Sequence, residues 1–167
     1  IFVLALGAYS ALRTLPQRSG IFEVTNESGT VNLALTPATL EAEPNTDYTL
    51  DILIDSPDPI YGANVELEFS PSELNINSVT QGDYFAGSLA DAKIAGNKIT
   101  FTYVALPGSG GNSGPGTLAS INLTTNDVNT SLAFTTQTYV IDLDANNVLE
   151  TATDTQITIT SPNDPPD

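Results

Sequence analysis

The stretch that decides the fold class is residues 64–69, which read NVELEF. The apolar residues Val65, Leu67 and Phe69 alternate with the polar residues Asn64, Glu66 and Glu68. In an extended chain this alternation places the apolar side chains on one face and the polar ones on the other. The stretch therefore predicts a half-buried β-strand that covers a core with one face and meets solvent with the other.

The same alternation recurs along most of the chain after residue 30. Further apolar positions in such stretches are Val31, Leu33, Leu35, Leu50, Ile52, Ile54, Ile99, Phe101, Tyr103, Leu118, Ile121, Leu123, Leu132, Phe134, Tyr139, Ile141, Ile157 and Ile159. Turn-forming residues separate the predicted strands at 44–45, 57–59, 96–97 and 107–116. Helical periodicity is almost absent after residue 20. Many short strands joined by turns predict an all-β sandwich or barrel.

The composition excludes several classes of function. The chain has 167 residues, 20 Asp plus Glu against 4 Lys plus Arg, and a net charge of -16. A surface this acidic argues against nucleic acid as a partner, because phosphate binding needs basic residues. The chain also has no His, Cys, Met or Trp. A Ser-His-Asp triad, a cysteine nucleophile and a His or Cys zinc site are therefore impossible.

The two ends of the sequence differ from its middle. Residues 1–12, IFVLALGAYSAL, are apolar, and we expect residues 1–18 to form a short apolar helix. This segment is interpreted as a membrane anchor, as part of a signal peptide or as an assembly element, and each interpretation places the remaining chain outside the cytoplasm. Residues 19–30 are expected to be a linker or an edge strand, and residues 161–167 a Pro/Asp-rich tail.

The order of segments between residues 31 and 160 resembles the cohesin domain family. The resemblance rests on VNLALTPATLEAEPNTDYTLDILIDSP (31–57), IYGANVELEFSPSELNINSVTQGDYF (60–85), NKITFTYVA (97–105), GPGTLASINLTT (114–125) and LAFTTQTYVIDLDANNVLETATDTQITI (132–159). It implies a jelly-roll β-sandwich of about nine strands. It also implies that one sheet face docks a dockerin-like protein. Carried over to this chain, that face comprises Asn64, Glu66, Glu68, Thr100 and Thr102. The alternative is an ordinary solvated face.

Two further motifs carry candidate chemistry. Asp142, Asp144 and Asn146 supply oxygen atoms at alternate positions, as in a calcium-binding loop, but the glycine and the distal glutamate of a full loop are missing. The alternative is an acidic turn between two strands, without a cofactor. Asn-X-Ser/Thr sequons begin at Asn26, Asn122 and Asn129, and they have meaning only where surface proteins are glycosylated.

These observations predict a non-catalytic, extracytoplasmic module that binds another protein at the cell surface. One alternative is a structural subunit of a filament, surface layer or membrane complex, anchored through residues 1–20 with a neighbouring subunit as its partner. Another alternative is a carbohydrate-binding module, which the absence of Trp platforms disfavours. Glu66 and Glu68 lie about 7 Å apart by strand geometry, but spacing alone does not make a glycosidase pair. The sequence therefore predicts no enzyme.

Overall fold

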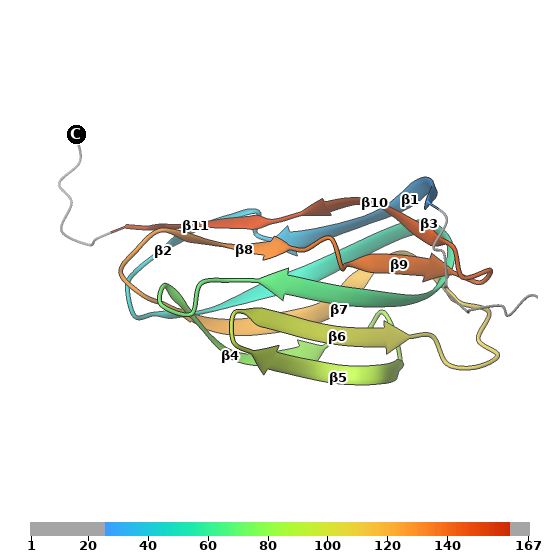
Figure 1. Ribbon diagram of the computed structural model, residues 1–167, viewed down its shortest axis with the longest axis horizontal. Coiled ribbons are helices and arrows are strands. Elements are labelled where there is room, and N and C mark those ends of the chain that lie inside the picture. Colours follow the sequence, from blue (N-terminus) through green and yellow to red (C-terminus); the bar gives the residue numbers. More distant parts are fainter. Residues whose placement is uncertain (1–25, 161–167) are drawn as a thin grey trace, which may run out of the picture.

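A computed structural model describes residues 26–160 of the chain, and every regular element in this part is a strand (Figure 1). The strands are β1 (Asn26–Thr36), β2 (Thr39–Ala42), β3 (Asp47–Glu68), β4 (Leu74–Gln81), β5 (Gly87–Ala95), β6 (Lys98–Val104), β7 (Asn112–Thr125), β8 (Thr130–Phe134), β9 (Tyr139–Asp142), β10 (Asn147–Thr153) and β11 (Thr155–Ile159). The predicted N-terminal helix over residues 1–18, residues 19–25 and the tail at 161–167 lie outside the described residues. The all-β prediction is confirmed.

The described part has eleven strands instead of about nine. One reason is a break at Asp154 between β10 and β11. The Asp154 carboxylate accepts a hydrogen bond from the backbone N–H of Phe134 at 2.8 Å, which holds the chain at this break. Strand β1 begins at Asn26, so residues 26–30, expected to be a linker or edge strand, are already part of the sheet.

Strand β3 is 22 residues long and joins the two layers of the sandwich. Its first half pairs with β1 and β7, and its second half pairs with β6, β8 and β9. The turn predicted at residues 57–59 is wrong, because β3 runs through this segment. The two prolines lie where the ladder to β7 is interrupted between Ser56 and Ile60, so their missing N–H groups cost no ladder bond. The hydroxyl of Ser56 donates to the carbonyl of Asp58 at 2.7 Å and fixes the bend.

The apolar faces of both layers pack into one core. Buried residues of β1, β3, β6 and β7 belong to a single cluster that includes Leu33, Ile52, Leu67, Phe101 and Leu118. Each of these side chains is almost fully removed from water. Burial of one such side chain contributes about 1.5–3 kcal/mol. The core therefore fixes which side of each strand is left for solvent. No helix in residues 26–160 is long and apolar enough to cross a membrane.

A reciprocal pair of hydrogen bonds holds the beginning of β7. The hydroxyl of Tyr84 donates to the carbonyl of Asn112 at 3.1 Å, and the Asn112 amide donates to the carbonyl of Tyr84. Burial, together with the negative charge of Asp55, raises the pKa of Tyr84 to about 12. The ordinary value is 10.0, so the folded state keeps its Tyr84 proton over a range in which the unfolded state loses it.

We expect this difference in pKa to make the protein less stable in alkali. The contribution of Tyr84 is fully present below its ordinary pKa of 10.0 and is lost as the pH rises toward the folded-state value of about 12. Tyr84→Phe should cost about 0.5–1.5 kcal/mol at neutral pH through the lost hydrogen bond. The free energy of unfolding of the variant should also fall less steeply with pH in alkali. The slopes of the two proteins should differ by no more than about 1.4 kcal/mol per pH unit. Chemical denaturation across this pH range measures both effects. Parallel curves for the two proteins would contradict the assignment.

Candidate protein-binding face

The second half of β3 lies in the middle of an open sheet face. Strands β9, β3, β6 and β5 are neighbours in this order, and Figure 1 shows them one below another. Asn64 lies opposite Thr102 in β6 and opposite Tyr139 in β9, and Glu66 lies opposite Thr100. Glu68 lies opposite Lys98. The structure therefore brings all five predicted residues together on one face, because they occupy the polar positions of the alternating strands.

Hydrogen bonds hold Asn64 in a fixed orientation at the centre of this face. Its Oδ1 accepts a bond from the hydroxyl of Thr102 at 2.8 Å. Its Nδ2 donates to the carbonyl of Gln137 at 2.9 Å. The two bonds tie β3 to β6 on one side and to the segment before β9 on the other. The side chain is thus ordered before any partner arrives, which lowers the entropy lost on binding.

Glu66 forms the ion pair of the face. Its Oε1 lies 2.7 Å from the Lys98 ammonium and accepts a second bond from the Thr135 hydroxyl at 2.9 Å. The bond from Lys98, followed by the bond from Thr135, lowers the pKa of Glu66. The same bond raises the pKa of Lys98, so the pair stays ionised at neutral pH. It is lost as the pH falls through the lowered pKa of Glu66 or rises through the raised pKa of Lys98. Glu66 is therefore not a proton donor at neutral pH.

Glu68 extends the polar network to the end of the face at the β5–β6 turn. Its Oε1 accepts a hydrogen bond from the amide of Asn97 at 2.7 Å, and this turn passes through Gly96 with φ +62°. The turn predicted at residues 96–97 is thereby confirmed. Lys93 and Lys98 are the only Lys or Arg residues between positions 26 and 160. Lys93 pairs with Thr100, so both lysines belong to this face.

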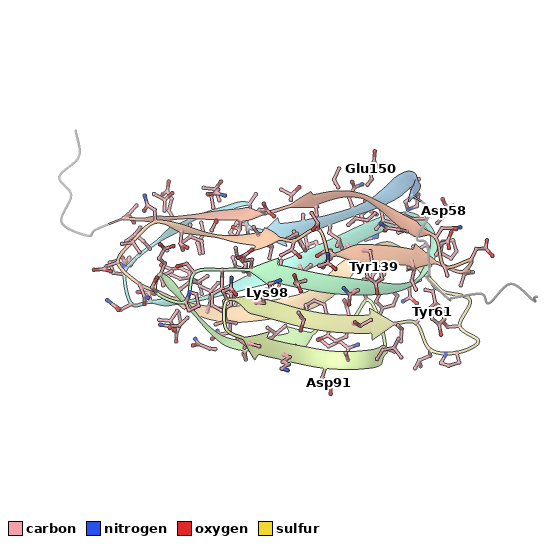
Figure 2. The ribbon with its side chains drawn as sticks, in the orientation of Figure 1. Asp58, Tyr61, Asp91, Lys98, Tyr139 and Glu150 are labelled. Atoms are coloured by element: carbon pink, nitrogen blue, oxygen red, sulfur yellow. The ribbon has the colours of Figure 1, made fainter. Side chains whose placement is uncertain are left out.

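The other end of the face is apolar, which the sequence did not reveal. Among the described residues, five exposed large apolar side chains come from segments near the end of the sheet where β6 and β9 end and β5 begins. They are Tyr61, Leu89, Leu106 and Tyr139, with Leu143 in the adjoining turn. Figure 2 labels Tyr61 and Tyr139 toward this end and Lys98 toward the other. The only signal in the sequence was broken alternation, since Val104, Ala105 and Leu106 are consecutive apolar residues.

Two glycines let neighbouring strands approach closely at this end of the face. A Cβ atom on Gly62 would lie 2.9 Å from Cγ1 of Val104 and 3.0 Å from the carbonyl oxygen of Tyr103. A Cβ atom on Gly87 would lie 2.8 Å from the carbonyl oxygen of Val104. Both distances are too short for an ordinary contact, so only glycine lets these strands approach. The exposed apolar residues beside the polar network are together called the apolar end.

The candidate calcium ligands lie in the turn between β9 and β10. Asp142 Oδ1 accepts hydrogen bonds from the backbone N–H groups of Asp144 at 2.9 Å and Asn146 at 2.8 Å. Asp142 Oδ2 accepts a bond from the Asn146 amide at 3.1 Å. Burial raises the pKa of Asp142, but the bonds from Asn146 and Asp144 outweigh burial and lower it. Residues 26–160 contain no group of three or more His, Cys, Asp or Glu side chains that could hold a metal ion.

These contacts are those of an acidic turn closed by its own hydrogen bonds, and calcium at Asp142, Asp144 and Asn146 stays a prediction. We expect Asp142→Ala to lower the free energy of unfolding by about 1–2 kcal/mol, because two backbone N–H groups lose a charged acceptor. In the unsubstituted chain this stabilisation should be present at neutral pH and fade as the pH falls through the lowered pKa of Asp142.

Thermal unfolding with calcium and with a chelator separates the two interpretations of the turn. If the turn needs no ion, Asp142→Ala should lower the thermal midpoint by the same amount with calcium and with the chelator. A higher midpoint with calcium in the unsubstituted chain, absent in the variant, would instead support the calcium loop.

Comparison with known proteins agrees with this geometry. The cohesin domain model matches residues 23–160. No curated protein matches the chain. A non-cellulosomal cohesin from Archaeoglobus fulgidus is 23% identical, with a TM-score of 0.66 over 81% of this chain and 94% of the other. A cohesin from Clostridium acetobutylicum is 18% identical, with a TM-score of 0.68 over 80% and 93%.

A third similar structure is the OlpC cohesin from Clostridium thermocellum, solved in a cohesin–dockerin complex. It is 13% identical, with a TM-score of 0.71 over 83% of this chain and 99% of the other. Likeness at these identities shows a shared fold. The family match covers most of the sequence and confirms the resemblance drawn from the order of its segments. The chain belongs to the cohesin domain family.

Proposed function

We propose that this chain is a non-catalytic binding module that docks a dockerin-like protein on the face formed by β9, β3, β6 and β5. The observation that carries the proposal is the composition of that face. An exposed apolar end lies directly beside an ordered polar network on neighbouring strands. Contiguous exposed apolar surface with a polar border is typical of protein-binding sites.

Family membership supports the type of partner. Cohesins of this fold from Clostridium thermocellum have been solved in complex with dockerins, among them the OlpC and OlpA cohesins. A cohesin from Clostridium acetobutylicum likewise forms a complex with a dockerin. By analogy with these complexes, we expect the partner of this chain to be a dockerin-like protein too.

The two ends of the face would contribute differently to binding. Leu89 and Leu106 are 74% and 52% exposed, so a partner that covers them removes a large apolar area from water. Asn64 and Glu66 are already held by Thr102, Lys98 and Thr135, and they would fix the orientation of the partner. Apolar anchors supply most of the binding energy of such interfaces, and ordered polar groups supply the specificity.

The charge distribution adds a condition on the partner. The chain carries a net charge of -16, and the two lysines of residues 26–160 make this face less acidic than the rest of the surface. A partner with basic groups around its contact surface would be attracted at long range by the acidic body. We therefore expect association to slow as salt is added.

We also propose that the module works outside the cytoplasm, at the cell surface or as a secreted protein. This proposal is supported by the apolar segment at residues 1–12, which has the composition of an anchor or of a signal sequence. Family membership is compatible with such a setting, in which binding modules are displayed on a surface and joined to partners noncovalently.

A pair of matched leucine variants tests the docking face. Leu106→Asp places a charge in the apolar end, and Leu53→Asp makes the same change at an exposed leucine on the outer face of the other layer. Purified dockerin modules, including those of the complexes named above, would be screened against the unsubstituted chain by titration calorimetry. For any dockerin that binds, Leu106→Asp should weaken affinity at least about tenfold, whereas Leu53→Asp should leave it unchanged.

Two further measurements make this test decisive. Asn64→Ala, which removes the ordered amide but no apolar area, should weaken the same complex by a smaller factor. Thermal midpoints of the three variants show that each remains folded. An equal loss of affinity in Leu106→Asp and Leu53→Asp would contradict the proposed face. If no dockerin in the panel binds the unsubstituted chain, the proposed class of partner is contradicted.

A further inference from the structure

The three sequons of the chain differ sharply in where the fold places them. Asn122 lies within β7, where its backbone pairs with Thr49 of β3 on one side and Ser78 of β4 on the other. Its side chain also accepts a hydrogen bond from Asn77 at 3.0 Å. Asn26 is the first residue of β1. Asn129, in contrast, belongs to the connection between β7 and β8, immediately before Thr130.

Asn129 has the local geometry of an accessible acceptor. Residues 127–129 are all exposed. The Asn129 Oδ1 accepts a hydrogen bond from the backbone N–H of Ile159 at 2.8 Å, which fixes the orientation of the amide group. Because the oxygen is occupied by this bond, the Nδ2 atom is the part of the amide left for another group. No hydrogen bond from Asn129 Nδ2 to another residue occurs within the part of the chain that the structure describes.

The third position of this sequon is also reachable. The hydroxyl-bearing residue is Ser131, which lines an open surface hollow of about 320 Å³ together with Thr130 and Glu73. The hydroxyl of Thr130 donates to the Glu73 carboxylate at 2.9 Å and that of Ser70 is bonded to Ser72 at 3.0 Å, so among the hydroxyl residues that line the hollow only Ser131 has no described side-chain bond. A glycosylating transferase must contact both the asparagine and the Ser or Thr of a sequon. Surface loops give it the steric access to do so.

The surroundings of Asn129 would tolerate a bulky polar group. Its neighbour Val128 is a large apolar side chain that is 43% exposed, and a glycan on Asn129 would shield it from water. The β7–β8 connection lies at one end of the long axis of the molecule, and the end of β6, where the apolar end begins, lies at the other (Figure 1). A group attached to Asn129 would therefore leave the apolar end free.

We propose that Asn129 is an N-glycosylation site of this protein. The co-reactant is a lipid pyrophosphate-linked oligosaccharide, delivered by the transferase of a secretory pathway. The Nδ2 atom of Asn129 forms a bond to the anomeric carbon of the first sugar, and the bond from that carbon to the pyrophosphate oxygen breaks. The amide nitrogen loses one proton, and the lipid pyrophosphate leaves. The site lies away from the apolar end, although Glu68 of the docking face also lines the hollow beside Ser131.

The test uses the full chain secreted from cultured eukaryotic cells and analysed by peptide mass spectrometry. We expect the peptide containing Asn129 to carry a glycan that peptide-N-glycosidase removes, leaving aspartate at position 129. Asn129→Gln and Ser131→Ala should both lose the modification. Ser131→Ala is the more informative variant, because it keeps the bond between Asn129 and Ile159, and Ser131→Thr should retain the glycan.

Asp47→Ser provides a positive control in the same fold. This substitution creates a sequon that begins at Asn45, in the exposed turn between β2 and β3. Glycosylation at Asn45 in this variant together with unmodified Asn129 in the unsubstituted chain would overturn the proposal. Modification of Asn122 instead of Asn129 would overturn it as well, because the fold would then not be what selects the site.

Discussion

The structure depends on one strand that serves two sheets. Strand β3 must continue from the β1–β3–β7 layer into the β9–β3–β6–β5 layer, so its chain bends at residues 56–60 without ending. The bend is built from two prolines, which need no ladder bond, and from the Ser56 hydroxyl, which bonds to the carbonyl of Asp58. Because both halves of β3 bury alternate residues in one core, the bend also decides which residues of the second half face solvent.

The candidate docking face follows from this constraint. Once Val65 and Leu67 are committed to the core, Asn64, Glu66 and Glu68 have to point outward. Their neighbours in β6 and the β8–β9 segment supply a hydroxyl, an ammonium and a carbonyl, so these outward groups are bonded to one another and not merely solvated. At Gly62 and Gly87 the strands that carry the adjoining apolar end approach closely. A binding surface thus arises beside the most ordered polar groups of the molecule.

Much of this arrangement could be predicted from the sequence, and the remainder depends on tertiary contacts. Alternation at residues 64–69 correctly predicted a strand and its outward side chains, because burial of one sheet face is a local pattern. The sequence could not show that 57–59 lies within a strand, because prolines signal a turn unless a bulge accommodates them. It also could not show that the exposed residues Leu89, Leu106 and Tyr61 lie at the same end of the sheet, since they come from three separate segments. The hydrogen bonds that the Asp142 oxygens accept from their own turn also became visible only in the fold, and calcium at this turn stays a prediction.

Whether the β9–β3–β6–β5 face binds the partner can be seen in a map of backbone amide shifts. The isotope-labelled chain would be titrated with a dockerin that binds it, and the change at each amide would be recorded by NMR. We expect the largest changes in residues 60–68, 87–95, 98–106 and 139–143, with little change along β4 and the outer face of β7. Changes concentrated on β4 and β7, with the second half of β3 unaffected, would contradict it.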